Sequence, residues 1–197
     1  MTDQTSTWTV LDQAHGALRD VVAAVPSDAW QLSTPCEQWT VAQVLQHAVG
    51  DQQGYAATIT GEGWPTENPF EPSGQLTGEP VALVESATRA AALAWSRVPA
   101  DGPDVTTPLP VGPLTPGVGV AACALDAAVH AWDIAVATGQ PSPLTPELAT
   151  ELHAAAVQFV EPLRAFAYAP VVPSEEGDGP AESLLRYLGR SPSWTAA

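Results

Sequence analysis

The spacing of apolar side chains along the chain predicts six helices. Apolar residues recur every three or four positions, which is the period of one helical face, and polar residues occupy the positions between them. In the first stretch Leu11, Leu18 and Val22 share such a face. The predicted helices run over about Thr7–Val25, Thr40–Ile59, Val81–Val98, Thr115–Thr138, Thr145–Tyr168 and Ala181–Leu188.

Capping residues support several of these helix ends. Thr40 and the glutamine three residues later fit a capping box, in which each side chain satisfies a free backbone N–H group. Thr115 and Thr145 each precede a proline, and a cap followed by proline is a common helix start. Gly139 can end the fourth helix. Pro162 is expected to kink the fifth.

Two segments rich in proline separate the helices and shape the expected fold. Residues 61–80 form an expected long loop. Residues 100–116 carry five prolines, which confine any strand to an edge, so a small β-hairpin near 104–114 stays open. We expect one all-α domain over residues 1–197, a four-helix bundle of the first, second, fourth and fifth helices with a crossover connection. The third helix or the proline-rich segment would cover an end.

The net charge of the chain excludes some classes of binding partner. It has 22 acidic residues, six arginines and no lysine, which gives a formal net charge of −16. Nucleic acids and anionic membrane surfaces are bound through basic side chains, so we expect neither partner. Two cysteines make no disulfide framework, and no secretory signal or uninterrupted apolar span of about 20 residues occurs. We expect a cytoplasmic protein, either a monomer or a homodimer.

The fourth predicted helix carries the candidate chemistry. Its side chains between residues 118 and 137 are almost all apolar, so we expect burial on every side. Apart from Cys123, its ionisable groups are Asp126, His130 and Asp133, which line one stripe, the first two about 6 Å apart. A buried carboxylate beside a histidine must be ion-paired, hydrogen-bonded or metal-bound. The alternatives are a solvent-facing stripe and a simple Asp–His hydrogen bond in the core.

His47 is the third candidate ligand. It lies at the edge of the apolar face of the second helix. It completes a metal site only if the second and fourth helices are neighbours, and otherwise it is a rim histidine. Two histidines and one carboxylate leave a coordination position open, a set that suits Zn²⁺ first and also Ni²⁺, Fe²⁺ or Mn²⁺.

Other residues near these motifs have two interpretations each. Asp133 is either an acceptor that fixes the tautomer of a ligand ring or a surface aspartate. Cys123, one turn before the first carboxylate, is either a thiol near the ion or a small buried hydrophobe. His15 and His153 are interpreted as core or rim histidines, and Cys36 receives no role. No arginine lies near the metal motifs, and no general acid or base stands out beyond the ligands.

Two segments resemble a known family. Residues 34–41, TPCEQWTV, with His47 after them, resemble the opening of the DinB-like metal-binding domain related to mycothiol-dependent maleylpyruvate isomerase. Residues 126–133, DAAVHAWD, resemble its second signature, and the tail over residues 184–190 is also similar. The resemblance covers about residues 8–192, nearly the whole chain.

The resemblance implies a four-helix bundle in which His47, Asp126 and His130 bind one divalent metal. The chain departs from the isomerase in two respects. The isomerase has glutamate where this chain has Asp126, which is one methylene shorter, so the affinity or geometry of metal binding can differ. The isomerase also carries an additional C-terminal domain that contributes to substrate binding, whereas this chain ends just after the bundle, so isomerase activity on maleylpyruvate is not expected.

The functional hypothesis is a metal-dependent enzyme that transfers a low-molecular-weight thiol, mycothiol as the resemblance implies, to a small electrophile. Metal coordination lowers the pKa of a thiol and presents a thiolate. Two alternatives stay open. One is a non-catalytic metal-binding module, such as a sensor or scaffold, and the other is a metal-free helical interaction protein.

Overall fold

Helices make up the regular structure of the chain. The computed structural model describes residues 8–36 and 38–195, and within them there are six α-helices, one 3₁₀ turn and no β-strand. The all-α class predicted from the sequence is confirmed. The predicted first residue Thr7 and Glu37 of the first signature lie outside the described residues. The elements are α1 (Thr9–Ala23), α2 (Val41–Thr60), α3 (Pro80–Trp95), α4 (Pro116–Ala137), α5 (Pro146–Ala156), the turn η1 (Glu161–Leu163) and α6 (Pro180–Tyr187).

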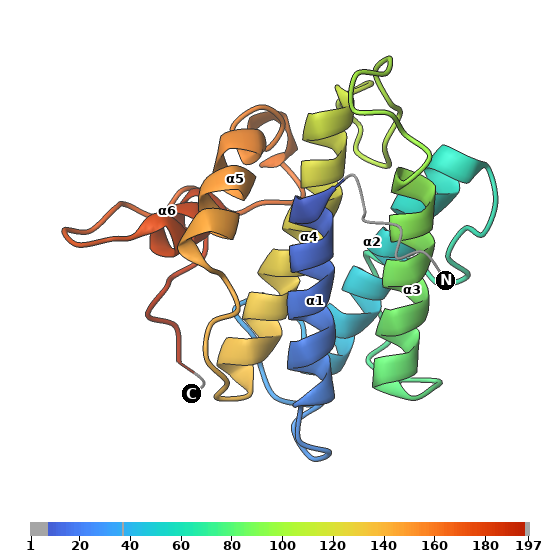
Figure 1. Ribbon diagram of the computed structural model, residues 1–197. Helices are drawn as coiled ribbons and strands as arrows, with labels where there is room; N and C mark the ends of the chain where they lie inside the picture. Colours follow the sequence, from blue (N-terminus) through green and yellow to red (C-terminus); the bar gives the residue numbers. More distant parts are fainter. Residues whose placement is uncertain (1–7, 37, 196–197) are drawn as a thin grey trace.

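Helices α1 to α4 form the four-helix bundle (Figure 1). Helix α4 packs on both α1 and α2, and α3 packs on the same two helices. Helices α1 and α2 therefore lie at opposite corners, as do α3 and α4, and each of these pairs is joined by a connection that crosses the bundle. The expected crossover is confirmed. The expected membership was wrong, because α3 takes the fourth place and α5 packs outside the bundle, against α4 and α6.

Helix α5 is much shorter than predicted, because it ends at Ala156 and does not reach Tyr168. Pro162 has no N–H, and its ring clashes with the carbonyl four residues earlier, so an α-helix cannot continue through it. The chain instead forms the short 3₁₀ turn around this proline. Phe159 and Leu163 are nevertheless buried, each 1 % exposed. Their helix-like spacing reflects contact with the core, not a continuous helix.

The β-hairpin left open for residues 104–114 is reduced to one bridge between Val105 and Leu114. The N–H of Val105 donates to the carbonyl of Leu114 at 2.7 Å, and the reverse bond is 3.0 Å. Prolines 108, 110 and 113 lie between them and have no N–H, so the ladder cannot extend inward. A similar single bridge joins Ser33 and Thr40 before α2.

Helix α4 runs through the core of the bundle, as its composition predicts. It is long and apolar enough to cross a membrane by length and composition alone, but 89 % of its apolar window is buried against the other helices. Helix α2, which packs against α4, begins with the predicted capping box at Thr40. The candidate ligands of α4 thus point into a packed interior.

Gly119 allows α4 to approach the end of α3 closely. A Cβ atom at Gly119 would lie 2.9 Å from a ring carbon of Trp95 and 3.4 Å from the methyl group of Thr107. Trp95 is completely buried, and its backbone carbonyl accepts a hydrogen bond from the indole N–H of Trp8 at 3.0 Å. The indole ring of Trp95 therefore has little room to move away from α4.

We expect Gly119→Ala to lower the free energy of unfolding by about 1–3 kcal/mol, because overpacking forces strain on the core. Gly117→Ala is the matched control, since a Cβ there meets nothing within 4 Å. It should leave stability unchanged or raise it by about 0.5–1 kcal/mol, because alanine restricts the unfolded chain. Urea denaturation of both variants measures the difference, and equal stabilities would contradict the close contact.

Candidate metal centre

The structure brings His47 of α2 next to Asp126 and His130 of α4. Oδ1 of Asp126 lies 3.6 Å from Nε2 of His47 and 3.5 Å from Nε2 of His130. The three residues each offer one ligand atom within 4.8 Å of the others. All three side chains are 9–11 % exposed, so the solvent-facing alternative for the stripe on α4 is wrong. The neighbouring positions of α2 and α4, which the sequence could not establish, bring the predicted ligand set together.

Hydrogen bonds at the far side of each ring fix the histidine tautomers. Nδ1 of His47 lies 2.9 Å from the carbonyl oxygen of Pro69, and Nδ1 of His130 lies 3.0 Å from Oδ2 of Asp133. Both partners only accept hydrogen bonds, so each Nδ1 carries the hydrogen. In the neutral rings both Nε2 lone pairs then face Oδ1 of Asp126. Three electron-rich atoms in contact require a proton or a cation between them.

A buried amide orients the carboxylate of Asp126. The Nε2 group of Gln52 donates to Oδ2 of Asp126 and to the backbone carbonyl of Cys123, both at 3.1 Å. Its Oε1 accepts from the thiol of Cys123 at 3.1 Å and from Nε2 of His15 at 2.8 Å. The network joins α1, α2 and α4. It occupies Oδ2 of Asp126 and leaves Oδ1 for the two histidines.

The structure also shows where the other residues lie that the sequence singled out. Cys123 is completely buried, which raises the pKa of its thiol well above the usual value. Among the described residues two groups could hold a metal ion, the predicted set and a second one of Cys36, His130 and Asp133, and Cys123 belongs to neither. His15 is a core histidine, 1 % exposed. His153 lies on α5 over the ring of Tyr187, at 5.1 Å between ring centroids.

Asp51 is a fourth ionisable group at the site, which sequence reasoning missed. Its Oδ2 lies 3.7 Å from Nε2 of His47, one helical turn away. Burial and the negative charge of Asp126 raise the pKa of Asp51 to about 7. Burial lowers the pKa of His47, but the close approach of Asp126 and the negative charges of Asp51 and Asp126 outweigh this and raise it to about 9. The i, i+4 spacing from His47 was the signal that could have found Asp51.

Asp133 lies behind His130 and joins its ring to Arg190 and Cys36. It is completely buried, so the surface alternative is wrong. The expectation that no arginine lies near the metal motifs is also wrong, because Nε and Nη2 of Arg190 donate to Asp133 at 2.9 and 2.8 Å. Burial raises the pKa of Asp133, but Arg190 and His130 outweigh this and hold it below its usual range. The thiol of Cys36 donates to the same carboxylate at 3.2 Å.

Two aromatic side chains cover the ring of His47. Trp39 lies 4.7 Å away between ring centroids, and Phe70 lies 5.6 Å away in an edge-to-face arrangement. Phe70 is 61 % exposed, so it forms part of the outer rim. The ligand set is therefore enclosed by apolar rings on one side, which strengthens electrostatic interactions inside it.

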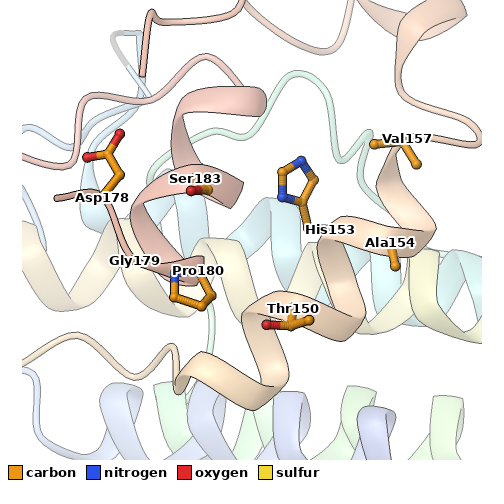
Figure 2. Close-up of a pocket in the computed structure, with 8 residues that line it drawn as sticks. All are labelled: Thr150, His153, Ala154, Val157, Asp178, Gly179, Pro180 and Ser183. Carbon is orange, nitrogen blue, oxygen red and sulfur yellow. The ribbon is translucent and has the colours of Figure 1, made fainter. Parts of the chain in front are cut away.

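An open groove of about 500 Å³ lies away from this cluster, between α5 and α6 (Figure 2). Its lining includes Ser183, His153 and Asp178, the residue types of a nucleophilic triad. Among the described residues, however, no hydrogen bond joins these three. Asp178 is instead paired with Nε of Arg186 at 2.9 Å. The groove lacks the contacts that nucleophilic catalysis requires, and the candidate site is the cluster around Asp126.

Comparison with known proteins identifies relatives of the chain. The family described as the mycothiol maleylpyruvate isomerase N-terminal domain matches residues 11–135. Two uncharacterized proteins of Mycobacterium tuberculosis, from strains CDC 1551 and H37Rv, are each 34 % identical over 185 residues, which covers 91 % of this chain and 94 % of theirs. No solved structure is significantly similar to the chain.

The buried ring of His15 makes stability depend on pH. Burial lowers the pKa of His15 to about 4, whereas the unfolded side chain titrates near 6.5. Between these values the unfolded state binds more protons, so stability should fall as the pH falls through this window, by about 3 kcal/mol from this group. Urea denaturation at pH 7 and pH 4 should show that His15→Gln loses this part of the decline. The control His153→Gln should keep most of it, because His153 is only half-buried and burial lowers its pKa less completely. An equal decline in all three proteins would contradict the assignment.

Proposed function

This chain belongs to the family of the mycothiol maleylpyruvate isomerase N-terminal domain, and we propose that it is a metal-dependent S-transferase. In this proposal His47, Asp126 and His130 hold one divalent cation, with Zn²⁺ as the first candidate. The thiol is of low molecular weight and of the mycothiol type, and the acceptor is a small electrophile. The observation that carries the proposal is the convergence of two Nε2 atoms on one carboxylate oxygen, while each Nδ1 atom is held by an acceptor on the far side of its ring.

The donor set fits such a cation in spacing and in chemistry. Ligands about 2.0–2.1 Å from a tetrahedral zinc ion lie about 3.3–3.4 Å from one another. The separations of 3.5 and 3.6 Å between Asp126 and the two histidines are close to this value. Asp126 supplies the single negative charge of the set, and the two neutral imidazoles add none. Nitrogen and oxygen donors of this kind also accept Fe²⁺, Ni²⁺ or Mn²⁺.

Each ligand is oriented by a different neighbour. The carbonyl of Pro69 holds the ring of His47, Asp133 holds the ring of His130, and Gln52 turns Asp126 so that Oδ1 faces the rings. When bound, the cation would lower the pKa of a coordinated thiol and act as a Lewis acid toward the electrophile. The protein residues supply orientation and a largely enclosed site.

Gly50 fixes the position of the loop that orients His47. A Cβ atom at Gly50 would lie 2.8 Å from Cβ of Pro69, which is closer than real side chains approach. The carbonyl of Pro69 is the partner of Nδ1 of His47. An added methyl group at Gly50 must therefore displace Pro69 relative to α2, which disturbs the contact between this carbonyl and the ring.

The first test is metal content together with thiol transfer. We expect about one equivalent of divalent metal in the wild type and in His153→Ala, and none in His130→Ala or His47→Ala, because two remaining ligands hold a cation weakly. Elemental analysis measures the metal, and loss of free mycothiol with an activated alkene measures turnover.

The outcomes separate the proposal from its alternatives. Undiminished thiol transfer in His130→Ala contradicts the proposal. Bound metal without rate enhancement for any thiol–electrophile pair indicates a non-catalytic metal-binding module. Metal-free protein whose melting does not change in chelator indicates a helical interaction protein.

The second test uses the glycines of α2. We expect Gly50→Ala to weaken metal binding about tenfold, since loss of a hydrogen bond that orients a ligand has effects of this size. Gly54→Ala is the control, because its Cβ would meet only Pro108, at an ordinary 3.6 Å. Competition with a chromogenic chelator gives both affinities. Equal affinities in folded proteins would show that the carbonyl of Pro69 does not orient the ligand.

A further inference from the structure

We propose that Arg190, which follows α6, is a positioning residue of the metal centre and acts on His130 through Asp133. This inference rests on the proposed function, because it takes His130 as a metal ligand. It also extends beyond the matched family region, which ends at residue 135. In this view the C-terminal segment completes the site and does not simply cover the bundle.

The contacts of Asp133 form a continuous chain from the guanidinium group to the ligand ring. Arg190 binds the carboxylate through two N–H groups, at 2.9 Å to Oδ1 and 2.8 Å to Oδ2. Oδ2 also accepts from Nδ1 of His130 at 3.0 Å and from the thiol of Cys36 at 3.2 Å. The two-point contact with Arg190 leaves the carboxylate no freedom to rotate, so it fixes the oxygen that meets the ring.

The contact between Arg190 and Asp133 is largely buried, so its loss would leave a buried charge unpaired. The side chain of Asp133 is 0 % exposed and that of Arg190 is 12 % exposed. A charged carboxylate at such a position is costly unless it is paired, so Arg190 keeps it charged and in place. The carboxylate in turn sets the tautomer of His130 and directs its Nε2 lone pair toward Asp126. Without Arg190 the ring loses a fixed acceptor.

The end of α6 is built to aim Arg190 at α4. Gly189 adopts φ = +83°, a conformation that favours glycine, and its Cβ would lie 2.6 Å from that of Ala169. The N–H of Arg190 donates to the carbonyl of Leu185 at 2.9 Å, which closes the last turn of the helix. The backbone therefore reverses at Gly189 and directs the next side chain back toward Asp133.

A second buried arginine provides a matched control. Arg186 lies on α6, is 7 % exposed as a side chain, and pairs with Glu175 at 3.0 Å and with Asp178 at 2.9 Å. Its ion pairs lie within the C-terminal region, at the groove between α5 and α6, and do not involve Asp133. Removing Arg186 should loosen the packing of α6 while leaving the contact between Arg190 and Asp133 intact.

The experiment compares the full-length wild type with Arg190→Met, Arg190→Lys and Arg186→Met. Chelator competition gives the affinity for Zn²⁺. The visible absorption spectrum of the Co²⁺-loaded protein reports the geometry of the ligands. We expect Arg190→Met to bind Zn²⁺ about 10–100-fold more weakly and to shift the Co²⁺ bands. Arg190→Lys should recover only part of the loss, because it keeps the charge without the two-point contact. Arg186→Met should lower the melting temperature of the metal-free protein and leave both metal measurements unchanged.

Wild-type affinity and an unchanged Co²⁺ spectrum in Arg190→Met overturn the inference. An equal loss of affinity in Arg186→Met overturns it as well, because the effect then comes from loosening of α6. If Arg190→Met does not fold, Arg190→Lys decides, and affinity equal to that of the wild type refutes the positioning role. A wild type that binds no metal is a separate result, because it refutes the proposed function itself.

Discussion

Charged and polar groups inside an apolar helix require partners, and this requirement organises the structure around α4. The helix buries Asp126, His130 and Asp133 on one stripe. Both carboxylates contact His130 on the same helix, and each also has a partner on another element, since Asp126 meets Gln52 of α2 and Asp133 meets Arg190 beyond α6. An unpaired buried charge costs more than most single apolar contacts supply. The polar stripe therefore specifies which segments lie beside α4 as firmly as the apolar side chains do.

The sequence predicted the helices and the buried stripe of ionisable residues on α4 well, because both are local properties. Apolar periodicity located all six α-helices of the described residues, and the spacing of Asp126 and His130 placed them on one face. Periodicity gave the wrong end for α5, because Phe159 and Leu163 keep a helical spacing although Pro162 prevents the helix from continuing. Spacing reports which side chains are buried, and a buried turn can satisfy the same pattern.

The remaining parts of the site depend on contacts between distant segments. Periodicity does not show which helices are neighbours, so the approach of His47 to α4 could only be expected from family resemblance. Arg190 lies 57 residues from Asp133 along the chain, and no local pattern joins the two. The short side chain of Asp126 reaches both rings, and Gln52 holds its other carboxylate oxygen.

One support of the site is invisible to any comparison of side chains. The acceptor that holds the ring of His47 is the main-chain carbonyl of Pro69, and every amino acid carries such a group. The hydrogen bond therefore does not depend on which residue occupies this position, provided that the path of the loop is conserved. In related proteins this support should be sought in the length and course of the connection after α2, and a residue-by-residue alignment of that connection would overlook it.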